Sequence, residues 1–341
     1  MPKIAFLETT NWEKDYLKKR PEFLSQIELF EEPLTLANVS QFKDYEVISC
    51  FINSQFTKDI LEQLPNLKLL ATRSTGFDHI DLATCQKKKI LVAYVPAYGS
   101  HTVAEYTFGL LLCLVRKIYQ AYHQVRETGS FSLEGLKGQE LYGKTIGVIG
   151  TGRIGINVIK IARGFEMNIL AYDKYPNEEL AQQLDFEYVP FEKLLMSSDV
   201  ITFHVPYNSE THHLLNREKI KLVKKGAVII NTSRGGVIET EALYQAIKSG
   251  QLAGAALDVL EEEGDIKEEQ ELLVKGGNLS SEKLKTVLLN HIFIDLDNVI
   301  VTPHNAFQTE EALENIVETT LDTIKSYLAG KPINIVSQTN L

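Results

Sequence analysis

Three polar side chains with complementary chemistry follow apolar stretches in the second half of the chain. Arg234, Glu263 and His304 each lie shortly after a run that predicts a buried strand. An arginine can hold a carboxylate through two hydrogen bonds and polarise a neighbouring carbonyl. A histidine can protonate an oxygen as hydride reaches the attached carbon, and a nearby carboxylate raises the pKa of that histidine and orients its ring. The set therefore predicts reduction of a carbonyl that lies beside a carboxylate.

Each of the three residues also has an ordinary structural interpretation. Arg234 alone could be a surface residue, and His304 alone could be a histidine whose hydrogen bonds are satisfied at a strand end. Glu263 belongs to a run of three glutamates, which taken singly favours a solvated acidic turn. No histidine has the spacing of a metal ligand set, so we predict no metal site.

A glycine-rich turn in the middle of the chain indicates the source of the hydride. The turn reads Gly150-Thr151-Gly152-Arg153-Ile154-Gly155, directly after the apolar run Thr145–Ile149. A helical pattern follows, and then a second apolar run that ends in Asp173, 18 residues after Gly155. This order of strand, glycine motif, helix, strand and acid is the pattern of a dinucleotide site.

Each part of the motif has a physical reason. Gly150 permits the tight turn, Gly152 lets the backbone approach a pyrophosphate, and Gly155 lets the helix pack closely on the strand. The free N–H groups at the start of the helix attract phosphates. Asp173 can accept hydrogen bonds from a ribose 2′-hydroxyl and repels a 2′-phosphate, which favours NAD over NADP, although Lys174 beside it weakens that preference. A simple structural turn is the alternative for a glycine motif taken alone.

Strand-like and helix-like segments alternate on both sides of the motif. Apolar runs that predict strands lie at residues 3–7, 45–51, 67–71, 90–95, 145–149, 168–172, 199–203, 227–231, 253–257 and 298–301. Such alternation is typical of parallel sheets that have helices on both faces. At 341 residues, two domains are the natural expectation. We therefore predict an α/β fold with two doubly wound parallel-sheet domains.

The first of these domains lacks a dinucleotide glycine motif and is expected to hold the substrate. Its loop Arg73-Ser74-Thr75-Gly76-Phe77-Asp78 follows a predicted strand. Ligands of parallel sheets bind beyond the carboxyl ends of the strands, so the backbone N–H groups of Thr75 and Gly76 could hold a small anion. A plain polar loop explains this segment equally well.

The positions of turns and helices indicate how the two domains are connected. The turn-rich segment 95–101 predicts a crossing between domains, and a helical tail at 310–327 predicts a return to the first. We therefore expect a Rossmann NAD domain at 102–304, inserted into a discontinuous, flavodoxin-like substrate domain at 1–101 and 305–341.

Two further segments carry structural expectations. A helical pattern at 102–127 has so broad an apolar face that it should pack against another domain or a second subunit. The mostly polar interval 261–292 predicts an elaborated surface loop with one or two short helices, one of them at 282–289.

Composition excludes several classes of protein. The net charge of −10 argues against a nucleic-acid or anionic-membrane partner. The three cysteines, Cys50, Cys85 and Cys113, are too widely spaced for a disulfide framework or a zinc ribbon. The longest apolar run, 108–115, is too short to span a bilayer, and the N-terminus lacks the apolar length of a signal peptide. We therefore expect a cytoplasmic protein.

Together the motifs resemble those of the D-isomer-specific 2-hydroxyacid dehydrogenases, in the same order and over nearly the whole chain. The features that carry the resemblance are the glycine motif at 150–155, Asn231-Thr232-Ser233-Arg234-Gly235-Gly236, Asp258 with Glu263 five residues on, Thr302-Pro303-His304, the loop at 73–78, and Val103-Ala104-Glu105.

The resemblance implies roles for particular residues. It implies that Arg234, Glu263 and His304 form the catalytic set, and that the backbone of Thr75 and Gly76 binds the substrate carboxylate. It further places Tyr98 near the substrate, Asp258 at the nicotinamide end, and a homodimer interface on the helix from about Thr102. The residues expected around NAD are Gly150, Gly152, Arg153, Ile154, Gly155, Asp173, Val205, Pro206, Thr232 and Asp258.

Within that family the sequence is most similar to the D-lactate dehydrogenases, which implies a small, pyruvate-like 2-oxo acid and a D-lactate-like product. The similarity lies in the segment 95–98, the long interval before Asn298, and the segment 303–307. The chain departs from that branch at Gly99-Ser100-His101, where Ser-Pro-Asn is common, and at Gln308, where an aromatic residue often follows. These departures leave the identity of the 2-oxo acid open, and His101 is a further group that could contact substrate or cofactor.

Two alternatives remain at this point. One is another dehydrogenase on the same scaffold, acting on formate, phosphite or phosphoglycerate; His304, where glutamine favours formate, argues against the first of these. The other is an NAD-sensing binding protein, which the intact set of Arg234, Glu263 and His304 disfavours. Turnover of 2-oxo acids with NADH distinguishes a dehydrogenase from a sensor.

Overall fold

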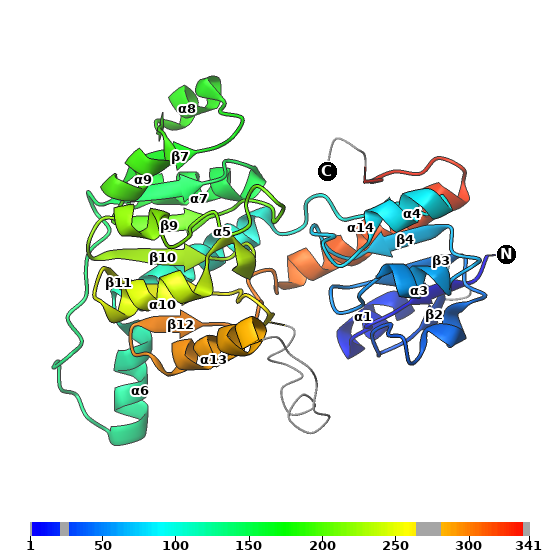
Figure 1. Ribbon diagram of the computed structural model, residues 1–341, viewed down its shortest axis with the longest axis horizontal. Coiled ribbons are helices and arrows are strands. Elements are labelled where there is room, and N and C mark those ends of the chain that lie inside the picture. The colour runs from blue at the N-terminus through cyan, green and yellow to red at the C-terminus, as the bar shows by residue number, and fades with distance from the viewer. Residues whose placement is uncertain (1, 21–26, 264–280, 337–341) are drawn as a thin grey trace. The chain divides into compact units, whose positions relative to one another are not determined.

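The computed structural model describes residues 2–20, 27–263 and 281–336. The chain forms two compact units, of which the first is Met1–Tyr98 with Thr309–Leu341 and the second is Gly99–Gln308 (Figure 1). The second unit is thus inserted into the first. The chain crosses between them at 98/99 and 308/309, whereas the sequence placed the crossings at 101/102 and 304/305.

The first unit contains a parallel sheet of five strands in the order β2-β1-β3-β4-β5. Its strands are β1 (Ile4–Phe6), β2 (Ile27–Leu29), β3 (Val47–Cys50), β4 (Leu69–Thr72) and β5 (Leu91–Ala93). This is the strand order of flavodoxin-like sheets. The predicted fold class of this unit is therefore confirmed.

Helices cover both faces of the first sheet because side chains of each strand alternate between the faces. The described helices are α1 (Asn11–Lys18), α3 (Lys58–Glu62), α4 (Leu82–Lys88) and α14 (Glu310–Leu328), with a short 3₁₀ helix η1 (Val39–Phe42). In β3, Val47 belongs to the buried cluster that contains Leu321 of α14, while the next residue, Ile48, belongs to the cluster on the other face, which contains Leu61 of α3. The C-terminal helix therefore completes the core of the first unit.

The second unit contains a parallel sheet of seven strands in the order β12-β11-β10-β9-β6-β7-β8. Its strands are β6 (Thr145–Ile149), β7 (Asn168–Tyr172), β8 (Glu187–Tyr188), β9 (Val200–Phe203), β10 (Ala227–Asn231), β11 (Leu252–Leu257) and β12 (Val299–Val301). The strand order reverses between β6 and β9, as in Rossmann folds, where ligands bind beyond the carboxyl ends of the strands at this reversal. The predicted Rossmann class is confirmed.

Helices form a layer on each face of this sheet. They are α5 (Ser100–Val115), α6 (Ile118–Thr128), α7 (Arg153–Gly164), α8 (Glu178–Leu184), α9 (Phe191–Ser197), α10 (Thr240–Lys248) and α13 (Ser281–Asp295), with 3₁₀ helices η2 (Lys219–Leu222) and η3 (Gly235–Val237). Figure 1 shows α9 and α10 on one face, with α5 and α7 on the other. Ile229 of β10 packs toward the first layer and Ile230 toward the second.

The predicted helix at 102–127 is wrong in two respects. It is two helices, α5 and α6, separated by Lys117 with a left-handed backbone of φ 57°. The apolar side chains of α5, among them Phe108 and Leu111, are buried against α7 and the sheet of the same unit, so α5 needs neither another domain nor a second subunit to cover it. Among the described helices, none is long and apolar enough to cross a membrane.

Candidate active site

The glycine-rich turn between β6 and α7 has the close contacts that its sequence predicts. Gly150 has φ 92°, a left-handed backbone that favours glycine. A Cβ atom at Gly155 would lie 1.9 Å from the carbonyl oxygen of Gly150, so any side chain there would displace the turn. The two glycines therefore let α7 start directly against the end of β6.

The start of α7 is open in the way that a pyrophosphate requires. Gly152 precedes the first helical residue and has no side chain to cap the free N–H groups there. Apart from Gly152 itself and its two chain neighbours, no described atom lies within 4 Å of the position that a Cβ of Gly152 would take. Of the next two predicted contacts, Arg153 is exposed and Ile154 is half-buried. The loop thus offers backbone donors with space in front of them, which fits the phosphates of NAD.

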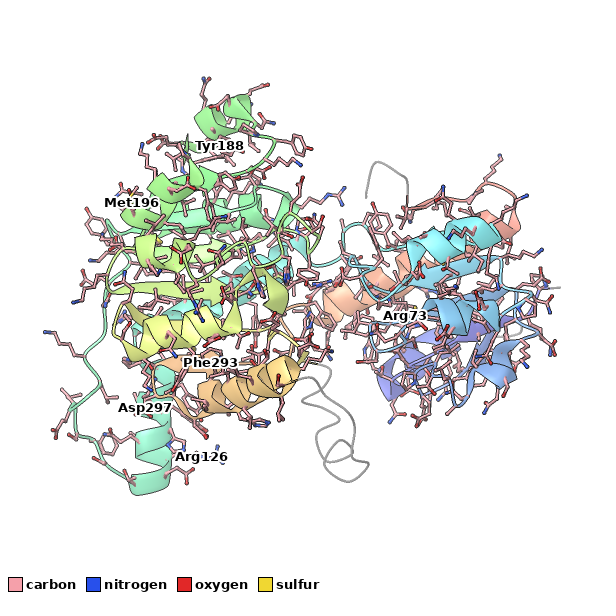
Figure 2. The ribbon with its side chains drawn as sticks, viewed as in Figure 1. Arg73, Arg126, Tyr188, Met196, Phe293 and Asp297 are labelled. Atoms are coloured by element: carbon pink, nitrogen blue, oxygen red, sulfur yellow. The ribbon has the colours of Figure 1, made fainter. Side chains whose placement is uncertain are left out.

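Asp173, at the end of β7, is held against the same turn. Its Oδ2 accepts hydrogen bonds from the Thr151 backbone N–H at 2.7 Å and the Thr151 hydroxyl at 2.9 Å. Its Oδ1 accepts from the Tyr175 backbone N–H at 2.9 Å. Thr151 also contacts the hydroxyl of Tyr188, which is labelled in Figure 2, at 2.7 Å. A carboxylate has about four acceptor positions, so half-buried Asp173 retains capacity for a ribose hydroxyl.

Glu263 and His304 form a direct pair. Oε1 of Glu263 lies 2.6 Å from Nδ1 of His304. An ionised carboxylate only accepts hydrogen bonds, so Nδ1–H is the donor and Nε2 is the ring nitrogen left for other partners. The His304 side chain is 18% exposed and that of Glu263 is 33% exposed, so the pair is largely shielded and yet reachable.

Asp258 organises the backbone around His304. It is 1% exposed, and its carboxylate accepts three hydrogen bonds: from the Thr302 hydroxyl at 2.6 Å, the Asn305 N–H at 3.0 Å and the Ala306 N–H at 2.9 Å. Its carbonyl oxygen also accepts from the His304 N–H at 2.8 Å. The side chain thus supports the turn that carries His304, while its predicted contact with the nicotinamide stays a prediction.

Tyr106 of α5 is a functional candidate that the sequence did not single out. Its hydroxyl donates to Oδ1 of Asn305 at 2.6 Å, next to His304. Burial is the main cause that raises the pKa of Tyr106. Tyr106 lies within the helical pattern at 102–127, whose broad apolar face gave no sign of a polar role for this residue. The only signal available was that a buried tyrosine hydroxyl usually finds a partner.

Arg234 lies on the loop after β10, beside the loop that leads to Glu263. Its side chain is half-buried, and its Nη1 donates to the Ser233 carbonyl at 2.8 Å. A Cβ atom at Gly235 would lie 2.0 Å from the backbone of Leu260, so the two loops are in contact. The structure therefore brings the segments that carry Arg234 and Glu263 together at the carboxyl ends of adjacent strands.

The remaining predicted cofactor residues also follow strand ends. Val205 is half-buried, and one of its methyl groups would lie 2.9 Å from a Cβ at Gly150. Pro206 is exposed beside it. Thr232 is buried, and its hydroxyl lies 3.0 Å from that of Thr107 in α5. Val205 and Pro206 thus border the glycine turn, whereas Thr232 joins the sheet to α5.

His204, just before Val205, is a half-buried residue whose imidazole ring is shielded from solvent. Its Nε2 lies 2.9 Å from the Thr202 hydroxyl, and its Nδ1 is buried with no hydrogen-bond partner among the described residues. Burial lowers the pKa of His204 to about 3. The ring is therefore neutral near pH 7, which excludes it as a source of protons there.

The candidate carboxylate loop lies in the first unit, after β4. Within the described residues, the backbone N–H groups of Thr75 and Gly76 donate no hydrogen bond. The Thr75 hydroxyl donates to the Val95 carbonyl at 2.8 Å, and that of Ser74 donates to the Gly76 carbonyl at 2.5 Å. Tyr98 is half-buried at the end of this unit. The loop is therefore fixed by its side chains while two backbone donors remain for an anion.

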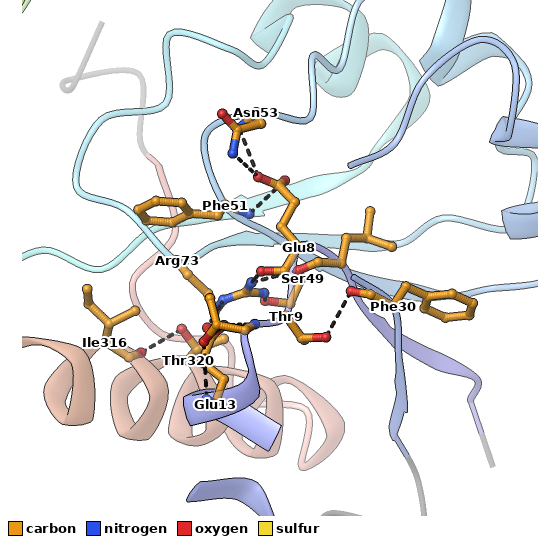
Figure 3. Close-up of polar contacts among 12 residues, drawn as sticks. Glu8, Thr9, Glu13, Phe30, Ser49, Phe51, Asn53, Arg73, Ile316 and Thr320 are labelled. Atoms are coloured by element: carbon orange, nitrogen blue, oxygen red, sulfur yellow. Dashed lines mark hydrogen bonds and ion pairs between the residues drawn. The ribbon is translucent and has the colours of Figure 1, made fainter. Parts of the chain in front are cut away.

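Arg73, the first residue of this loop, holds it to neighbouring elements of the first unit. Figure 3 shows its guanidinium group between Glu13 and Ser49, with Nε 3.0 Å from Oε1 of Glu13 and Nη1 3.1 Å from the Ser49 hydroxyl. Nη2 donates to the Leu7 carbonyl at 2.6 Å, and the side chain is 1% exposed. The ion pair with Glu13 connects this arginine to α1, and its hydrogen bonds connect the carboxyl ends of β1, β3 and β4. We find in Arg73 a second residue whose importance the sequence did not indicate.

Comparison with known proteins places the chain in a family. Residues 108–306 match the NAD-binding domain of the D-isomer specific 2-hydroxyacid dehydrogenases. The chain belongs to this family and is an NAD-dependent oxidoreductase, as the motifs predicted.

The relatives include D-lactate dehydrogenases. A 2-hydroxyacid dehydrogenase homolog of Haemophilus influenzae is 40% identical over 335 residues, covering 96% of this chain and 97% of the relative. The D-lactate dehydrogenase of Escherichia coli is 36% identical over 335 residues, covering 96% and 98%. The crystal structure of Aquifex aeolicus D-lactate dehydrogenase complexed with NAD and lactic acid matches with a TM-score of 0.87 at 36% identity, over 98% of each chain. The predicted similarity to the D-lactate dehydrogenase branch is confirmed.

Proposed function

We propose that the chain reversibly reduces a small, pyruvate-like 2-oxo acid to the D-2-hydroxy acid with NADH. The observation that carries this proposal is the Glu263–His304 pair, whose 2.6 Å contact leaves Nε2 of His304 as the proton donor. Bound NADH supplies the hydride. His304 protonates the oxygen of the carbonyl as that hydride reaches the carbon, and removes the proton in the reverse direction.

Glu263 keeps His304 ready for this step. Its carboxylate accepts the hydrogen bond from Nδ1–H of His304, so Nε2 is the ring nitrogen that faces the proton transfer. The same hydrogen bond fixes the plane of the ring. In the oxidation direction the ring accepts the proton, and the adjacent carboxylate stabilises the cation that forms.

Each of the two units carries hydrogen-bond donors that suit a carboxylate. Arg234 presents a planar guanidinium group that suits bidentate contact with a carboxylate and can polarise the adjacent carbonyl. Thr75 and Gly76 provide two backbone N–H groups for the same class of anion. Donors of these kinds suit a carboxylate, which supports 2-oxo and 2-hydroxy acids as the class of substrate.

Pyruvate is the substrate that the relatives favour, and a panel assay tests it. NADH oxidation is followed at equal enzyme concentration with pyruvate, 2-oxobutyrate, 2-oxoisocaproate and phenylpyruvate. We expect kcat/KM to be highest with pyruvate and the product to be D-lactate by chiral analysis. A higher kcat/KM with a branched or aromatic 2-oxo acid would contradict the lactate assignment. Turnover of none of the four would contradict the wider proposal.

We also propose a homodimer, built by α6 and the segment after it. The apolar residues exposed there are Ile118, Tyr119, Tyr122, Val125, Phe131 and Leu133. Phe131 and Leu133 are 84% and 83% exposed. Figure 1 shows α6 projecting away from the sheet of its own unit. An apolar group of this extent on a monomer is typical of an interface, and a second copy of the chain is the partner proposed.

A further inference from the structure

Lys174, the residue that follows Asp173, forms an ion pair with Glu210. Nζ of Lys174 lies 2.8 Å and 2.6 Å from the two carboxylate oxygens of Glu210. Both side chains are solvent-exposed, at 57% for Lys174 and 63% for Glu210. The hydrogen bond that Lys174 donates to Glu210 is the main cause that raises the pKa of Lys174. The ammonium group beside the proposed ribose-binding acid is therefore already occupied.

Glu210 is held in place by its own loop, which follows Val205 and Pro206. Oδ1 of Asn208 accepts hydrogen bonds from the Glu210 N–H at 2.9 Å and the Thr211 N–H at 3.1 Å. The Thr211 hydroxyl donates to the Pro206 carbonyl at 2.6 Å. This turn fixes the backbone of Glu210 opposite the end of β7. The turn therefore fixes the backbone from which the Glu210 side chain reaches Lys174, while the ion pair itself joins two exposed side chains.

We propose that Glu210 is a specificity-determining residue that excludes NADP(H) by occupying Lys174. A lysine next to the ribose-binding acid is a potential ligand for a 2′-phosphate, because an ammonium group binds phosphate as a point charge. With Glu210 in place, Asp173, Lys174 and Glu210 carry a combined charge of −1, and the positive member is already paired. Removal of Glu210 releases the cation and brings the combined charge to zero.

This inference rests on the proposed role of Asp173 as the group that binds the adenosine ribose. Exposed ion pairs are weak, so the effect of Glu210 is bounded. Glu210→Gln should reduce the ratio of the dissociation constants of NADPH and NADH by roughly three- to tenfold. The gain should vanish in about 0.5 M salt, because exposed charges are then screened.

The test is a binding measurement that requires no turnover. Isothermal titration calorimetry gives the dissociation constants of NADH, NADPH, AMP and 2′,5′-ADP for the full-length protein. Glu210→Gln should lower the ratio of the dissociation constants of 2′,5′-ADP and AMP. The factor should be the same as for the ratio of the dissociation constants of NADPH and NADH. The agreement of the two ratios places the effect at the 2′-phosphate.

Three further variants separate the mechanism from a general change in charge. Glu210→Gln with Lys174→Gln should lose the gain, because the released cation is then absent. Glu218→Gln is the matched control, since Glu218 forms a similar exposed pair with Lys221 at 3.1 Å and precedes β10 rather than following a strand. It should leave both ratios unchanged. Asp173→Ala, which removes the repulsion directly, is the positive control.

The outcomes distinguish this inference from the function on which it rests. Normal NADH binding with an unchanged ratio in Glu210→Gln would overturn the inference and leave the dehydrogenase proposal intact. A gain that persists in the double variant, or that Glu218→Gln reproduces, would also overturn it. Loss of binding of every nucleotide in Glu210→Gln would show a structural role and count against it. Failure of the unmodified protein to bind NADH would refute the proposed function itself.

Discussion

His304 occupies an unusual backbone conformation that its neighbours hold in place. Its φ of 54° lies in the left-handed region, which costs a residue with a side chain about 1–2 kcal/mol. The turn is retained because the His304 N–H donates to the Asp258 carbonyl and the Asp258 carboxylate binds the two N–H groups that follow. Strained conformations of this kind concentrate at functional sites, since they fix a side chain where a relaxed backbone would not.

Replacement of His304 tests the assignment of the acid. His304→Gln keeps a hydrogen-bonding side chain and loses the transferable proton, so kcat for 2-oxo acid reduction should fall by roughly 10²–10⁴-fold. NADH binding should remain, since His304 is not among the residues that border the glycine turn. Stopped-flow turnover and fluorescence titration of NADH measure the two quantities separately. Near-normal kcat in this variant would remove His304 from the mechanism.

His204 should make the folded state sensitive to acid. Its pKa is lowered to about 3 in the folded chain, against about 6.5 in an unfolded one, so the unfolded state binds more protons between these values. The contribution of His204 is therefore constant above about pH 7.5 and becomes increasingly unfavourable as pH falls from there toward 3. His204→Asn should reduce the loss of unfolding free energy between pH 7 and pH 5 by about 2 kcal/mol.

Urea denaturation of the protein and the variant at both pH values measures this difference. His101→Asn is the control, since His101 is exposed at the start of α5 and its ring meets water in both states. It should lose as much stability on acidification as the unmodified protein. If His204→Asn and the unmodified protein lose the same free energy of unfolding on acidification, the folded state does not disfavour protonation of His204, and the prediction is wrong.

At the level of elements, the break between α5 and α6 depends on one left-handed residue. Lys117, at φ 57°, lies between the buried helix α5 and the exposed helix α6. Glycine adopts this conformation without strain, whereas alanine does not. The free energy of unfolding of Lys117→Gly should therefore be about 1 kcal/mol higher than that of Lys117→Ala. Both variants lack the lysine side chain, so the difference between them reports the backbone conformation alone. Urea denaturation measures the two free energies of unfolding. A more stable alanine variant would contradict the prediction that the backbone at residue 117 is strained.

How far the sequence predicts these elements depends on how local their signals are. The strand Thr145–Ile149 and the glycines after it were predictable because each has a distinct local pattern. The break at Lys117 was not, because the helical period continues through it and lysine gives no signal for a left-handed backbone. Helix α1 was missed although Thr10 and Glu13 form a capping box, a signal that the sequence did contain. Strand β8 has only two residues, too few for any periodicity.

The site was predictable to the extent that it follows strand ends. The segments that carry Arg234, Glu263 and His304 follow neighbouring strands, and parallel topology brings such ends together. The supporting residues were not predictable, because they act through tertiary contacts. Tyr106 and Arg73 meet partners far away in sequence, Asn305 in one case and Glu13 in the other. Glu210 likewise meets Lys174 from a separate loop.

For the whole molecule, exposed apolar residues predict association with a second copy. The chain has a mass of 38.4 kDa, so light scattering after size exclusion should give about twice that value for the unmodified protein. Phe131→Asp with Leu133→Asp should give 38.4 kDa instead, because two carboxylates oppose burial of this surface. Both side chains are more than four-fifths exposed in the single chain, so the variant should fold normally.

Leu36→Asp is the matched control for this test, because Leu36 is also an exposed leucine, 59% accessible, in the other compact unit. It should remain a dimer if association depends on the particular surface formed by α6 and the residues after it. Circular dichroism of all variants checks that folding is retained. A monomeric unmodified protein, or a dimer that survives both aspartates, would contradict the proposed interface. Dissociation by Leu36→Asp as well would instead place the contact, at least in part, on the first unit.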